Sequence, residues 1–212
     1  MKTLLINAHP DFKQTDSYSA KLQQVFLAAF HKRFPSAHLT YLTLYDTMIP
    51  RIEENQLLRV WEKQQKHELL TSSEEVIAKT SSDLLAQFKE HHRIVIVSPL
   101  HNFNVSSRLK DYIDNILIAR ETFKYTDTGS VGLMTDDYRL LYLQASGSVY
   151  TNNDRYTPLE FSHYFLKEMF TEIMGFEKFY IVRAQGTALY SADEVLKFLP
   201  EEMEATVNQF YD

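Results

Sequence analysis

The stretch that decides the fold is RIVIVSPLHNFNVSSRLKDYIDNILIAR, residues 93–120. It opens with the apolar, β-branched run Ile94–Val97, which is typical of a strand buried on both faces, because such a strand has no polar side. Pro99 cannot donate to a strand ladder, so we expect the strand to end there. The polar and aromatic loop Leu100–Asn104 follows. Apolar residues at helical spacing then predict an amphipathic helix over Leu109–Leu117, with Ser106 or Ser107 as its cap.

The rest of the chain repeats this strand–helix pattern, giving five pairs in all. The expected strands are Lys2–Ala8, His38–Tyr45, Ile94–Val97, Arg139–Gln144 and Lys178–Ala184. The other expected helices run from Ser17 to about Phe34, from Ser72 to about His91, from Leu159 to about Gly175, and from Ser191 towards the C-terminus. Ser72 with Glu75, and Ser191 with Glu194, match capping boxes. The alternation predicts an α/β fold, a doubly wound five-stranded parallel sheet in the order 2-1-3-4-5, in one domain over residues 1–212.

Two segments fall outside this pattern. Asp46–Ser72 is too long for a simple connection, and segments of that size are often functional or interfacial. Thr122–Met134 contains an Asp-Thr-Gly turn signal, which favours a hairpin or a lid.

Composition excludes several classes of function. The net charge of −6 argues against a general nucleic-acid binder, and the absence of cysteine excludes disulfides, Cys-ligated zinc and thiol catalysis. The histidines have no metal-ligand spacing such as HExxH, and GxxxxGK[ST], GxGxxG and GxSxG are absent. No apolar run approaches the roughly 20 residues that span a membrane, and the first apolar run is too short for a signal peptide. We therefore expect a soluble, cytoplasmic protein.

Three unusual loops follow the first, third and fourth strands: His9–Ser19, Leu100–Asn104 and Ala145–Tyr150. In the 2-1-3-4-5 order they converge on one crevice at the carboxyl ends of the strands. Hydroxyl groups near Ser17, where a helix begins, suit a phosphate, although Ser17 could equally serve only as an N-cap. Asn102 suits the polar edge of a flat heterocycle, or else serves its own turn.

Four segments together resemble the FMN-dependent NADH-azoreductases, also called NADH:quinone oxidoreductases, of the flavodoxin-like fold. They are LINAHP (5–10), TDSYS (15–19), SPLHNFNVSSRLKDYID (98–114) and TFKYTDTGSVGL (122–133). The resemblance extends from Lys2 to about Tyr190. It implies a homodimer with two FMN sites at the subunit interface. It also implies a ping-pong cycle, in which NADH reduces FMN and leaves, and the reduced flavin then reduces a quinone or an azo compound by two electrons.

The resemblance also assigns residues. FMN contacts fall on His9, Ser17, Tyr18 and Ser19 at the phosphate, on Leu100, His101, Asn102 and Phe103 along the isoalloxazine ring, and on Ala145, Ser146, Gly147 and Ser148 at its pyrimidine edge. Tyr125 corresponds to a substrate-facing aromatic residue that reaches over the partner's flavin. His101 and Tyr125 are candidate proton donors, and no catalytic residue is certain.

Two positions depart from the family pattern. The last loop often reads S/A-R-G-G in the family, whereas here Ala145–Ser148 lacks the arginine and has a serine for the second glycine, which is expected to change FMN affinity or potential. Ile173 stands where some relatives place a second-subunit Phe. Two other functions stay open, a flavodoxin-like FMN electron carrier that does not oxidise NADH and a flavodoxin-like protein that has lost FMN. NADH rather than NADPH rests on the resemblance alone.

Overall fold

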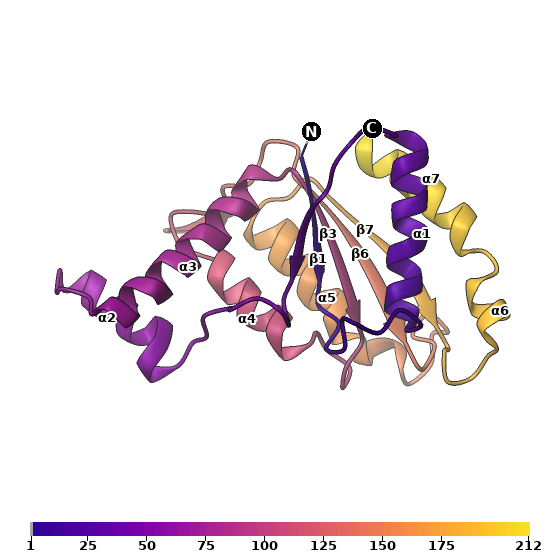
Figure 1. Cartoon of the computed structure of the whole chain (residues 1–212), viewed down its shortest axis with the longest axis horizontal. Helices are drawn as coiled ribbons and strands as arrows, with labels where there is room; N and C mark the ends of the chain where they lie inside the picture. The colour runs from indigo at the N-terminus through magenta and orange to yellow at the C-terminus, as the bar shows by residue number, and fades with distance from the viewer. Residues whose placement is uncertain (1) are drawn as a thin grey trace.

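Five parallel strands form the central sheet of the computed structural model, which describes residues 2–212 (Figure 1). The strands are β1 (Thr3–Asn7), β2 (Thr40–Thr43), β3 (Arg93–Pro99), β6 (Arg139–Ser146) and β7 (Lys178–Gln185). They lie in the order β2-β1-β3-β6-β7, and every neighbouring pair is parallel. Since β6 and β7 are the fourth and fifth strands of the sheet, the predicted 2-1-3-4-5 order is confirmed.

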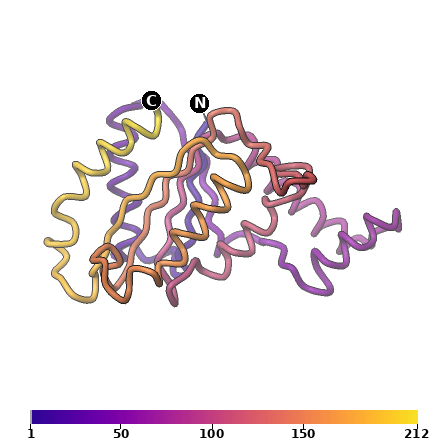
Figure 2. Tube along the Cα trace, turned by 180° about the vertical axis from the view of Figure 1, so that it is seen from behind, coloured from indigo at the N-terminus to yellow at the C-terminus, as the bar shows by residue number. Residues whose placement is uncertain are grey.

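Helices cover both faces of the sheet (Figures 1 and 2). One face carries α1 (Tyr18–Arg33) and α7 (Leu199–Tyr211), and the short α6 (Ala192–Leu196) precedes α7. The other face carries α3 (Ser72–Glu90), α4 (Ser107–Ile116) and α5 (Phe161–Glu168) with its π-helical end η3 (Met169–Ile173). In β3, Ile94 and Ile96 pack in the core under α4, whereas Val95 and Val97 pack in the core under α1. Burial on both faces explains why this strand has no polar alternation.

Three predicted helix ends were wrong in detail. The capping box of α3 is formed by Thr71 and Glu74, one residue before the predicted pair Ser72–Glu75: the Thr71 hydroxyl accepts from the Glu74 N–H, and the Glu74 carboxylate accepts from the Thr71 N–H. The last helix is interrupted between α6 and α7, where Pro200 occupies the first turn of α7. The predicted helix 159–175 is also preceded by a separate 3₁₀ turn, η2 (Thr157–Leu159). The capping box of Ser191 and Glu194 is confirmed.

Two segments project from the layered body. Residues 46–71, called the arm here, contain the π-helical turn η1 (Glu54–Leu58) and α2 (Arg59–Gln65), and extend far to one side of the sheet (Figure 1). The predicted hairpin is formed by β4 (Phe123–Thr126) and β5 (Gly129–Gly132), which pair antiparallel apart from the main sheet. Within residues 2–212, no helix combines the length and apolar composition needed to cross a membrane.

Candidate functional site

The loops after β1, β3 and β6 lie side by side at the carboxyl edge of the sheet. Because β3 is hydrogen-bonded to both β1 and β6, the three strands end as neighbours. Two contacts then hold the loops together: the Ser106 hydroxyl donates to the Ala8 carbonyl at 3.0 Å, and the Leu100 N–H donates to the Ala145 carbonyl at 2.7 Å. Ser106 stands at the N-cap position of α4 but makes no capping bond with its side chain, so its hydroxyl joins two loops instead.

The first loop ends in a set of unsatisfied donors at the start of α1. Ser17 is the N-cap, and its hydroxyl accepts from the Ala20 N–H at 3.1 Å. The backbone N–H groups of Tyr18 and Ser19 have no acceptor within residues 2–212. Ser19 is 2% exposed, and its hydroxyl is likewise unpaired within this part of the chain. Free donors at the positive end of a 16-residue helix form a site for an anion such as a phosphate.

His9 lies half-buried in the same loop. Its Nδ1 accepts from the Asp11 N–H at 3.1 Å, and its own backbone N–H donates to the Asn7 side chain at 2.9 Å. These bonds fix the direction in which the chain leaves β1, and they engage one ring nitrogen of His9 in shaping the loop.

The second loop is a tight turn with an unusual backbone. The backbones of His101 and Asn104 exchange two hydrogen bonds of 3.0 Å, and the two residues between them, Asn102 and Phe103, have φ values of 47° and 66°. Positive φ at both central positions is the pattern of a type I′ turn, which normally selects glycine or asparagine. A phenylalanine there is strained, and such strain concentrates at functional sites.

The side chains of this turn face outwards. His101 and Asn102 are exposed, and Phe103, at 39% exposed, is not a core residue. Backbone bonds close the turn, so the Asn102 side chain is not needed for it. Leu100 is half-buried at the base of the loop.

The third loop turns its carbonyl groups away from the other two loops. The carbonyls of residues 146–148 accept hydrogen bonds from the N–H groups of residues 186–188, in the pairs Ser146–Thr187, Gly147–Ala188 and Ser148–Gly186, each 3.1 Å long. The N–H groups of residues 147–149 have no acceptor within residues 2–212. Ala145 is buried, and the buried Ser146 side chain donates to the Ser148 carbonyl at 2.9 Å, so it shapes the loop from inside.

Tyr150, at the end of this loop, was missed by sequence reasoning. Its ring is 6% exposed and meets Phe103 edge to face, with 6.4 Å between ring centroids. Its backbone N–H donates to the Gln185 side chain at 3.0 Å. Burial raises the pKa of the Tyr150 hydroxyl above its usual range. The sequence indicated a role for Tyr150 only by placing it at the end of the predicted loop Ala145–Tyr150.

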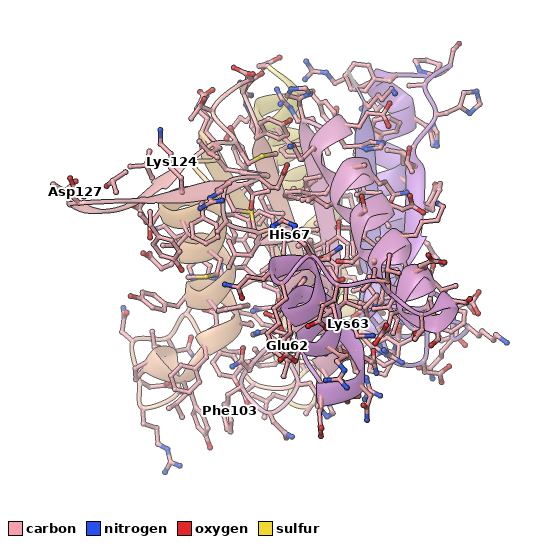
Figure 3. The ribbon with its side chains drawn as sticks, turned by 90° about the vertical axis from the view of Figure 1, so that its left-hand side faces the viewer. Glu62, Lys63, His67, Phe103, Lys124 and Asp127 are labelled. Atoms are coloured by element: carbon pink, nitrogen blue, oxygen red, sulfur yellow. The ribbon has the colours of Figure 1, made fainter. Side chains whose placement is uncertain are left out.

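Tyr125 is not brought to these loops by its own chain. It lies on β4 with its side chain 74% exposed, and it lines a cavity of about 910 Å³ with Trp61 of α2 and the cationic side chains of Arg120 and Lys124. Figure 3 shows Lys124 on the projecting hairpin, well away from Phe103. Ile173 lies half-buried in η3.

Comparisons with known proteins decide what this site belongs to. Residues 1–209 match the family described as having a flavodoxin-like fold. The FMN-dependent NADH:quinone oxidoreductase 1 of Lactiplantibacillus plantarum is 56% identical over 100% of this chain and 99% of its own length. The FMN-dependent NADH:quinone oxidoreductase of Streptococcus agalactiae is 49% identical over 100% of this chain and 99% of its own length. The chain is a member of the FMN-dependent NADH:quinone oxidoreductase family.

A solved structure agrees with this assignment. The crystal structure of an FMN-dependent NADH-azoreductase from Bacillus anthracis in complex with FMN superposes with a TM-score of 0.92 at 48% identity, covering 100% of this chain and 99% of that one. The family predicted from the sequence is therefore confirmed.

The residues present in this family member fit FMN. The unpaired hydroxyl of Ser19 and the free N–H groups at the start of α1 match a phosphate, which accepts hydrogen bonds and carries negative charge. The outward-facing N–H groups of residues 147–149 match the ring-edge acceptors of a flavin. Ser148 has no positive φ, so the serine in place of the family's glycine is accommodated without backbone strain.

Proposed function

We propose that this chain is an FMN-dependent oxidoreductase that takes two electrons from NADH and passes them to quinones and azo compounds in a ping-pong cycle. The observation that carries the proposal is the pairing of a buried, unsatisfied Ser19 hydroxyl with free helix N–H groups at the edge where three loops meet. Relatives that are 49–56% identical over the whole chain and bear this activity in their names support it.

FMN supplies the hydride chemistry when it is bound, and the protein supplies binding and orientation. Ser17, Tyr18 and Ser19 hold the phosphate, with His9 shaping that loop. Leu100, His101, Asn102 and Phe103 lie along the ring. The backbone N–H groups of Gly147 and Ser148 serve the pyrimidine edge. Ala145, whose carbonyl accepts from the Leu100 N–H, and Ser146 act by shaping the loop.

His101 and Tyr125 are the proposed proton donors to the reduced acceptor, because both side chains are exposed and free to reach a ligand. The test is the pH dependence of quinone reduction in His101→Ala and Tyr125→Phe. A variant with the wild-type turnover and pH profile excludes that residue as the donor.

We propose a homodimer in which the arm and the hairpin meet a second copy. The arm stands away from the sheet in Figure 1, and the hairpin that carries Lys124 and Asp127 does so in Figure 3. Both segments carry exposed apolar side chains, including Leu58 at 47% exposed and Tyr125 at 74% exposed. Large apolar groups on projecting segments are typical of interfaces. In such a dimer Tyr125 can cover the flavin of the partner subunit, because Tyr125 does not lie near the flavin loops of its own chain. A monomer in sedimentation equilibrium, with FMN bound, would refute this arrangement.

We further propose that residues 1–212 form one domain and that the protein acts in the cytoplasm. An electron carrier that does not oxidise NADH is the alternative function. The deciding experiment is the absorbance spectrum of the purified protein before and after anaerobic addition of NADH. Flavin bands near roughly 370 and 450 nm that bleach with NADH support the oxidoreductase. Bands that persist identify the carrier, and no bands after added FMN refute both.

A further inference from the structure

The connection between β7 and α6 lies behind the third loop of the site and contacts it along its length. Besides the three backbone hydrogen bonds from residues 186–188, the Gln185 side chain accepts from the Tyr150 N–H at 3.0 Å and donates to the Thr151 hydroxyl at 2.7 Å. We propose that residues 185–188 are a positioning element that sets the orientation of the flavin-edge peptides and thereby tunes FMN affinity and reduction potential. This inference rests on the proposed function.

Peptide geometry gives the first step. In a trans peptide the carbonyl of one residue and the N–H of the next point in opposite directions. Residues 186–188 hold the carbonyls of residues 146–148, and the N–H groups of the same three peptides are those of residues 147–149. These are the three N–H groups without an acceptor in residues 2–212. The connection therefore determines that all three donors face away from it.

Gly186 makes this arrangement possible. Its φ of +75° is a conformation that side-chain-bearing residues rarely adopt. A Cβ at this position would lie 2.6 Å from the Tyr190 ring and 3.1 Å from the Val149 side chain. The Gly186 carbonyl also accepts from the N–H groups of Leu189 and Tyr190, at 2.9 and 3.0 Å. A side chain at Gly186 must therefore displace the Tyr190 ring, and the positive φ that it opposes strains the peptides that hold the third loop.

The chemistry of the ligand gives the second step. A reduced flavin carries more negative charge at its pyrimidine edge than an oxidised one, and hydrogen bonds to a charged acceptor are stronger than those to a neutral acceptor. Correctly oriented N–H groups therefore stabilise the reduced form more and raise the reduction potential. If the peptides rotate, both forms bind more weakly, and the reduced form loses more.

The test compares Gly186→Ala with wild-type protein, each prepared as apoprotein. The measurements are the Kd for FMN by fluorescence titration and the midpoint potential of bound FMN. We expect the Kd of the oxidised form to rise about tenfold. A further tenfold loss of affinity in the reduced form lowers the two-electron potential by about 30 mV.

Ser191→Ala is the matched control. It removes the capping hydroxyl of α6, and so loosens the end of the same connection, but leaves the bonds of residues 185–188 in place. Its Kd and potential should equal those of the wild type. Equal shifts in both variants, or no shift in Gly186→Ala, would overturn the proposal.

Gln185→Ala keeps the proposal testable if Gly186→Ala does not fold. It removes the hydrogen bond to the Tyr150 N–H of the third loop and the one to the Thr151 hydroxyl just after it. We expect a Kd rise of about threefold with a lower potential. An unchanged Kd and potential in this variant would count against the positioning role. If the wild-type protein binds no FMN, the proposed function itself is refuted. If the wild type binds FMN but the variants do not differ from it, only the positioning role is refuted.

Discussion

Asp137 provides the sharpest test of the forces that hold the sheet, because one carboxylate serves two buried arginines. It lies at the amino edge of the sheet, opposite the three loops. Its two oxygens accept from Arg93 and Arg139, each at 2.7 Å. The Arg93 side chain is fully buried and that of Arg139 is 6% exposed, whereas the Asp137 side chain is 46% exposed. Arg139 also donates to the carbonyls of Gln209 and Phe210, and so joins the end of α7 to the sheet.

The cost of Asp137→Ala follows from these contacts and from the φ of 54° at this position, where alanine adds about 1 kcal/mol of backbone strain. Two hydrogen bonds between charged groups are worth about 3–6 kcal/mol together if they are fully buried. Because water reaches the half-exposed carboxylate and can replace it, we discount this by about half, to roughly 2–3 kcal/mol. Asp137→Asn keeps one acceptor oxygen without the charge, and should lose about half as much.

Urea unfolding of the apoprotein measures this loss. With a slope of about 2 kcal/mol per molar, the unfolding midpoint of Asp137→Ala should fall by roughly 1.5–2 M. Asp136→Ala is the matched control, because the neighbouring carboxylate makes no hydrogen bond or ion pair within residues 2–212. Equal midpoints for the two variants would refute the reasoning. The FMN affinity of both should equal that of the wild type, since the flavin loops lie at the other edge of the sheet.

The same carboxylate predicts a pH dependence. Burial raises the pKa of Asp137, but hydrogen bonds to Arg93 and Arg139 and their positive charges outweigh it and hold that pKa below its usual range. A carboxyl whose pKa is lower in the folded state stabilises the protein above its unfolded-state pKa of about 3.9. This stabilisation is lost as the pH falls through the lower folded-state pKa. The difference in unfolding free energy between wild type and Asp137→Asn should therefore be constant above about pH 5 and shrink below pH 4.

Three further predictions concern the site and the helix cap. Ser19→Ala should raise the FMN Kd about tenfold without destabilising the apoprotein, because the hydroxyl that it removes is buried and unpaired. A destabilised apoprotein with an unchanged FMN Kd would contradict this prediction. Phe103→Gly should change the unfolding free energy by less than about 1 kcal/mol, since relief of positive φ offsets the lost aromatic contact, while quinone turnover falls. Thr71→Ala should lower the free energy of unfolding in urea by about 1 kcal/mol, and Ser72→Ala should lower it little. The reverse result would support Ser72 and Glu75 as the capping box, as predicted from the sequence.

The order of the sheet was predictable because it depends on patterns that many residues share. The apolar run Ile94–Val97 could only be a strand covered on both faces, and alternation of strands with amphipathic helices leaves few topologies. The cap of α3 was misplaced because Thr71 and Ser72 are both good caps and both have a glutamate three residues later. Sequence spacing alone does not distinguish them. Backbone geometry at the first turn does.

The orientation of the site residues was much less predictable, because it depends on single peptide groups. Ser146 was expected at the ligand, yet its hydroxyl turns to the Ser148 carbonyl. Phe103 has positive φ, which local preference opposes and which only the paired backbones of His101 and Asn104 sustain. The role of Gly186 depends on strands brought together from distant parts of the chain. No local pattern encodes such contacts.

The unsatisfied groups of the site have a consequence for the apoprotein. The unpaired Ser19 hydroxyl costs about 1–3 kcal/mol, and the strained backbone at Phe103 about 1–2 kcal/mol. A ligand that accepts a hydrogen bond from the Ser19 hydroxyl removes the cost of leaving that hydroxyl unpaired. Part of the binding free energy of FMN is therefore the relief of this cost in the apoprotein. FMN at 100 times its Kd should raise the unfolding free energy of the wild type by about 2.7 kcal/mol. At the same FMN concentration, Ser19→Ala should gain about half of that, because its Kd is about tenfold higher. Equal gains would mean that the Ser19 hydroxyl does not contact the phosphate.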